Sequence, residues 1–92
     1  MSWLINWYKN QCDGDWEHCY GVRISSLDNP GWRLSVSLGE TGLESKKFID
    51  IEIERTESDW VHCFIKNRSF EAACGVSNLM EAIEIFRKWV EN

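Results

Sequence analysis

The sequence predicts an α+β domain, in which an antiparallel meander sheet of four or five strands is covered on one face by an N-terminal and a C-terminal helix. Three observations predict this fold. Apolar residues recur at helical spacing near both ends of the chain, they alternate with polar residues in between, and turn residues separate the alternating runs. The chain of 92 residues has room for a single domain, residues 1–92.

A first helix is expected over residues 2–11, because four large apolar side chains fall on one side of it. They are Trp3, Leu4, Trp7 and Tyr8. Asp13 and Gly14 are expected to end this helix, since glycine readily adopts the positive φ found at helix ends.

Two strands are expected next. From Trp16 to Ser25 the apolar spacing changes to two, which predicts a half-buried strand. The segment Asn29-Pro30-Gly31-Trp32 fits a type II turn with a positive φ at Gly31. A second strand over residues 32–38 then pairs antiparallel with the first.

The central part of the chain predicts a loop and up to three more strands. Residues 39–47 are polar and are expected to form a flexible connection. In the third strand, Ile49, Ile51 and Ile53 are expected to face the core, and the carboxylates between them the opposite side. After a turn at residues 56–59, a fourth strand over residues 60–66 is partly apolar on both faces. Residues 69–73 are a candidate fifth strand.

The end of the chain, from Ser77, predicts an amphipathic helix with Ser77 or Asn78 as its N-cap. Its apolar face consists of Leu79, Ala82, Ile83, Phe86, Trp89 and Val90.

The charge balance limits the class of partner. Ten basic and fifteen acidic residues give a net charge of −5, which is the wrong sign for binding nucleic acid or an anionic membrane. The same charge attracts basic proteins. The sequence lacks the pattern of a secretory signal and any apolar run of the ~20 residues that span a bilayer, so we expect a cytoplasmic protein with reduced cysteines.

Metal and catalytic sites are not predicted, and no cofactor is expected. The four cysteines, Cys12, Cys19, Cys63 and Cys74, lack the spacing of zinc ligands. His18 and Cys19 are neighbours on a predicted strand and so point to opposite faces, and His18 is expected to be partly buried. Trp16 and Trp60 stand at strand starts, where their rings could be exposed. The alternative function is therefore that of a small-ligand or sugar-binding module, or of a minor enzyme. In either case Trp16, His18 and Trp60 would form its pocket.

A negatively charged surface is the predicted partner-binding site. It consists of Asp50, Glu52, Glu54, Glu57 and Asp59. Arg23 and Arg33 also point outward, but two arginines cannot neutralise five carboxylates. Asp13, Asp15 and Glu17 are further candidates for the same surface.

Several motifs resemble the bacterial immunity protein 53 family of polymorphic toxin systems. The longest are W-Y-x-x-Q-C-D-G-D-W-E-H-x-Y-G at residues 7–21 and L-D-N-P-G-W at residues 27–32. Shorter ones are I-E-R-x-E-x-D-W at residues 53–60, F-E at 70–71, N-L at 78–79 and I-F-x-x-W at 85–89.

This resemblance implies a single-domain cytoplasmic protein that is made beside a toxin and blocks it by binding, without catalysis or a cofactor. The predicted function is therefore inhibition of a cognate toxin protein. Together with the acidic surface, this favours a basic, nuclease-like toxin domain as the partner.

Overall fold

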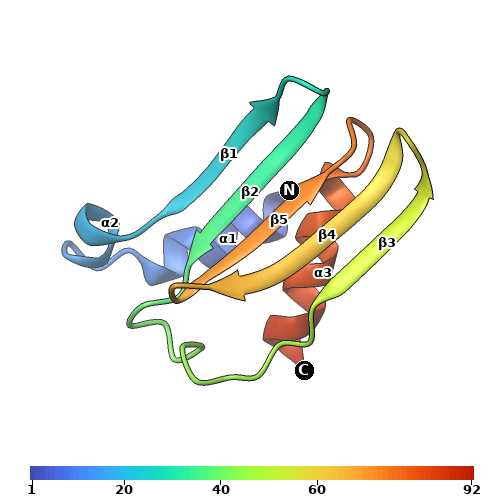
Figure 1. Cartoon of the computed structure of the whole chain (residues 1–92). Helices are drawn as coiled ribbons and strands as arrows, with labels where there is room; N and C mark the ends of the chain where they lie inside the picture. Colours follow the sequence, from blue (N-terminus) through green and yellow to red (C-terminus); the bar gives the residue numbers. More distant parts are fainter.

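The computed structural model describes residues 1–92 and contains three helices and one five-stranded antiparallel sheet. In chain order the elements are α1 (Ser2–Gln11), α2 (Trp16–Cys19), β1 (Val22–Leu27), β2 (Gly31–Ser37), β3 (Ile51–Thr56), β4 (Asp59–Lys66), β5 (Ser69–Cys74) and α3 (Leu79–Glu91). Figure 1 shows α1 and α3 on one face of the sheet and no helix on the other. The predicted α+β fold is confirmed, and so are the candidate fifth strand and the terminal helices.

The sheet has the strand order β1-β2-β5-β4-β3, so its two edges are β1 and β3. The predicted meander holds within two parts, the hairpin β1–β2 and the run β3–β4–β5. These parts are joined where β2 pairs with β5. Residues 38–50 connect β2 to the far edge of the sheet (Figure 1).

The core lies between the covered sheet face and the two long helices. Phe86 of α3 contacts Phe70 of β5, with ring centroids 4.9 Å apart, and meets Trp7 of α1 edge-on at 5.1 Å. Aromatic rings bury about 150–250 Å² each, so this cluster gives a small domain much of its apolar core. The fully buried side chains include Phe70, Phe86, Leu34, Leu38, Val36 and Val61.

The segment Trp16–Cys19 forms the short helix α2, so the prediction of a strand from Trp16 was wrong for these residues. The observed strand β1 begins only at Val22. Local carboxylates explain the helical turn. Asp13 Oδ1 accepts the backbone N–H of Trp16 at 2.9 Å, and Glu17 accepts that of Gly14 at 2.9 Å. Such contacts satisfy donors that a helix start leaves free.

The side chains of α2 also differ from expectation. Trp16 is only 4% exposed, and its Nε1 donates to the carbonyl of Gly39 at 2.9 Å. Its ring is therefore buried and not exposed to solvent. His18 is exposed, not partly buried. The spacing of four between Trp16 and Tyr20 suits a helix as well as a strand, and their rings lie 6.0 Å apart.

Two glycines take different roles in the turns. Gly14 has a φ of +98° and follows the end of α1, as predicted. Gly31 does not have a positive φ, so the predicted type II turn was wrong. It pairs with Leu27 across the hairpin, which leaves Asp28 to Pro30 as the turn.

The approach to β3 also departs from the prediction. Strand β3 begins at Ile51, and Ile49 is 87% exposed and not in the core. The neighbouring Phe48 is partly buried and packs against the core instead, with its ring 5.4 Å from Phe70 and 5.6 Å from Trp89.

The N-cap of α3 is Asn78, one of the two residues predicted for it. None of the helices has the length and apolar character required to cross a bilayer.

Candidate partner-binding surface

The open face of the sheet carries the side chains that alternate with the core residues. In β4, Trp60, His62 and Phe64 alternate with the buried Val61 and Cys63. The pairing of β3 with β4 places Glu52 opposite His62 and Glu54 opposite Trp60. The open face therefore presents a row of rings beside an acidic edge strand.

Glu52 and Glu54, which together with the preceding Asp50 form the acidic edge of the sheet, lie beside the imidazole of His62. The Nε2 atom of His62 lies 3.4 Å from Glu54 Oε1, is shielded from solvent and has no hydrogen-bond partner. The potential ligand atoms of Glu52, Glu54 and His62 lie within 4.8 Å of one another, which is close enough to surround a cation. The ring of Trp60 packs edge-on against His62 at 5.2 Å.

The two arginines of β1 and β2 lie away from the acidic edge. Arg23 and Arg33 belong to β1 and β2, and strands β5 and β4 separate them from β3. Arg33 pairs with Glu71 of β5 at 3.3 Å. Neither arginine therefore pairs with Glu52 or Glu54.

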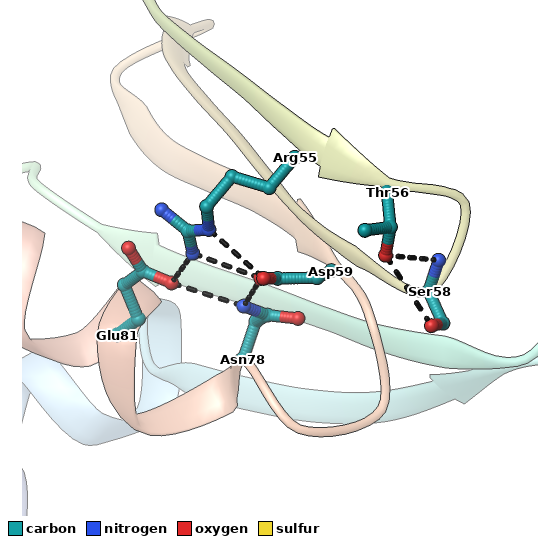
Figure 2. Close-up of polar contacts among 6 residues, drawn as sticks. All are labelled: Arg55, Thr56, Ser58, Asp59, Asn78 and Glu81. Carbon is teal, nitrogen blue, oxygen red and sulfur yellow. Dashed lines mark hydrogen bonds and ion pairs between the residues drawn. The ribbon is translucent and has the colours of Figure 1, made fainter.

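Asp59 lies apart from the acidic edge, in a polar cluster that joins the β3–β4 hairpin to the start of α3 (Figure 2). Arg55 contacts Asp59 at 2.9 Å and Glu81 at 2.5 Å. Asn78 donates to Asp59 at 2.8 Å and to Glu81 at 3.0 Å.

The charges in this cluster stabilise one another. Hydrogen bonds from Arg55, and then from Asn78, lower the pKa of Asp59, and the same two donors lower the pKa of Glu81. Both carboxylates raise the pKa of the Arg55 guanidinium. Asp59 therefore has its own partners within the fold, unlike Glu52.

The other predicted carboxylates are dispersed. Asp50 precedes β3 and Glu57 lies in the β3–β4 turn, and both are exposed. Asp13, Asp15 and Glu17 belong to the α1–α2 segment, next to β1 at the opposite edge of the sheet (Figure 1). The structure thus groups Asp50, Glu52 and Glu54, and it does not join them to the N-terminal carboxylates.

Two of the N-terminal carboxylates hold the backbone. The N–H groups of Trp16 and Asp15 lower the pKa of Asp13 by donating to it. The pKa of Glu17 is lowered by backbone hydrogen bonding at Glu17 itself and from Asp13 and Gly14.

The alternative pocket is not formed. Trp16 lies beside Gly39, just after the end of β2, whereas Trp60 is the second residue of β4 and lies near the opposite end of the sheet. None of the five surface hollows is lined by Trp16, His18 or Trp60.

The four cysteines are free thiols. Cys63 and Cys74 lie in the core, and burial raises the pKa of Cys63 to about 12, so this thiol stays protonated and unreactive at neutral pH. Cys12 and Cys19 lie in the α1–α2 region.

The sequence argument missed the role of Trp60, His62 and Phe64 as a row beside the acidic edge. The signal was present, since residues 60–66 are apolar on both faces. A strand with one covered face needs apolar residues on that face only, so the second apolar row points to a contact surface.

Of the comparisons with known proteins, the one with protein families gave a match. No curated protein and no solved structure matched the chain. The family described as Immunity protein 53 matched residues 1–91, almost the whole chain. The chain therefore belongs to the Immunity protein 53 family.

Proposed function

We propose that this protein binds and neutralises a cognate bacterial toxin in the cytoplasm, acting as a binding protein and not as an enzyme. The observation that carries the proposal is the match of the Immunity protein 53 family over residues 1–91. An immunity protein protects the cell that makes the toxin, so its target is a toxin protein.

The charge distribution supports a basic toxin domain as the partner. Asp50, Glu52 and Glu54 are exposed at one sheet edge and form no ion pair with a lysine or an arginine. A nuclease has to be basic where it holds nucleic acid, so its binding cleft would complement this edge. Charge complementarity raises the association rate, and the rings of β4 would supply desolvated contacts.

The direct test is co-expression. The toxin encoded beside this gene is induced in a host, with and without this protein. The proposal predicts that growth is restored by the protein and that the two proteins co-purify. If toxicity persists although the protein is folded and abundant, the proposal is wrong.

The toxin class is tested in the same cells. A nuclease toxin degrades DNA or RNA before growth stops, and co-expression prevents this degradation. A toxin that kills with intact nucleic acid would contradict the nuclease part of the proposal.

A further inference from the structure

A notch in the open face combines carboxylates with aromatic rings. This hollow, about 270 Å³ in volume, is lined by side chains and backbone of β3 and β4 and by the residue before β3. Its polar and aromatic lining consists of Asp50, Glu52, His62 and Phe64. Glu54 and Trp60 continue the same two rows beyond it.

From this arrangement we infer that the notch receives an arginine side chain of the toxin, whose guanidinium lies between the carboxylates of β3 and the rings of β4. This inference rests on the proposed toxin partner and names the contact by which the partner is recognised.

Three properties of the notch favour a cation. Its carboxylates have no lysine or arginine partner, since Arg55 is engaged with Asp59 and Glu81, and Arg33 with Glu71. The ring of His62 lines the notch, and its Nε2 atom, which lies against Glu54, has no hydrogen-bond partner within the fold. Aromatic faces attract cations, and Phe64 lines the hollow.

A guanidinium suits this lining better than an ammonium ion does. It is planar, donates several hydrogen bonds in a fork that matches a carboxylate, and stacks on rings while doing so. A divalent metal ion is the competing occupant, because Glu52, Glu54 and His62 could surround one. The high exposure of Glu54, at 69% of its side chain, argues against a built metal site.

The first experiment uses a small probe on the isolated protein. N-acetyl-arginine methylamide is titrated against labelled protein, and N-acetyl-citrulline methylamide serves as its uncharged counterpart. We expect saturable NMR shifts at the His62 ring and the Glu52 carboxyl carbon with the arginine probe only. The variant Glu52→Gln should lose them, and Glu84→Gln, an exposed carboxylate on α3, should keep them.

The second experiment uses the toxin complex. Since hydrogen bonds between charged groups are the stronger ones, the double variant Glu52→Gln/Glu54→Gln should bind the toxin about tenfold or more weakly. The control Glu84→Gln should bind like the wild type. Thermal unfolding of each variant confirms that it remains folded.

The outcomes separate this inference from the proposed function. If both probes act alike, if shifts require added Zn²⁺, or if the double variant binds the toxin as tightly as the wild type does, the arginine notch is wrong. A wild-type protein that fails to rescue toxin-expressing cells would instead contradict the proposed function, while the probe titration would still decide whether the notch binds guanidinium.

Discussion

Gly31 lies at the start of β2, where two strands approach closely. A Cβ atom added there would overlap the carbonyl oxygen of Cys74 on β5. Gly31 is therefore needed for close packing of the backbone and not for a positive φ. The N-P-G pattern of the sequence shows a turn, but it cannot show which neighbouring strand passes over the glycine.

Gly31→Ala should lower the free energy of unfolding by about 1–3 kcal/mol, as is typical when a side chain is forced into a packed site. The matched control is Gly21→Ala, because nothing lies within 4 Å of the Cβ position at Gly21. Urea denaturation of both variants measures the difference. Equal stability of the two variants would contradict the clash.

The periodicity of apolar residues predicted the strands with one covered face well. It failed where local side-chain contacts favour a different backbone conformation. Residues 32–38 alternate strictly, and β2 follows them almost exactly as expected. At Trp16 to Tyr20 the side-chain contacts of Asp13 and Glu17 favour a helical turn, and alternation alone cannot reveal this. Ile49 is exposed because the neighbouring Phe48 packs against the core beside Phe70 in its place.

At the scale of elements, the connection between β2 and β3 is held in place although it is polar. The Glu44 carboxylate accepts the backbone N–H groups of Glu40 and Gly42, both at 2.9 Å. Trp89 Nε1 of α3 donates to the carbonyl of Lys47 at 2.7 Å. Composition predicted a loop correctly, but these contacts depend on the final packing of α3.

The cluster around Arg55 joins the β3–β4 hairpin to α3, and its contribution to stability should depend on pH. The pKa of Asp59 is lowered from 3.8, so its stabilising effect is present above this value and is lost as the pH falls through the lower folded-state pKa. Asp59→Asn should therefore be less stable than the wild type at pH 7 and equally stable in strong acid.

Thermal unfolding between pH 7 and pH 2 measures this dependence. Glu57→Gln is the matched control, since Glu57 lies in the same hairpin turn and forms no ion pair. A stability difference for Asp59→Asn that stays constant over the whole range would contradict a role of the ionised carboxylate.

At the scale of the whole molecule, the open face has its arginines and its unpaired carboxylates near opposite edges. Arg23 and Arg33 lie toward β1, whereas Asp50, Glu52 and Glu54 lie at β3. The sequence predicted the acidic group of β3, because alternate residues of a strand share a face. It could not predict that α1 and α2 lie beside the opposite edge, since strand order and helix placement depend on contacts between distant parts of the chain.

The central claim is that toxin recognition depends on where the negative charge lies and not on its total. Two triple variants test it, because both change the net charge from −5 to −2 by removing three negative charges. The first is Asp50→Asn/Glu52→Gln/Glu54→Gln at the acidic edge. The second is Asp28→Asn/Glu84→Gln/Glu91→Gln, at exposed positions elsewhere.

The most direct measurement is the association rate of each triple variant with the toxin at increasing salt concentration. For the acidic-edge variant we predict a rate about tenfold or more below that of the wild type at low salt, with a weaker dependence on salt, since steering by complementary charge is screened by ions. The second variant should stay close to the wild type. Equal rates for the two triple variants would contradict the claim.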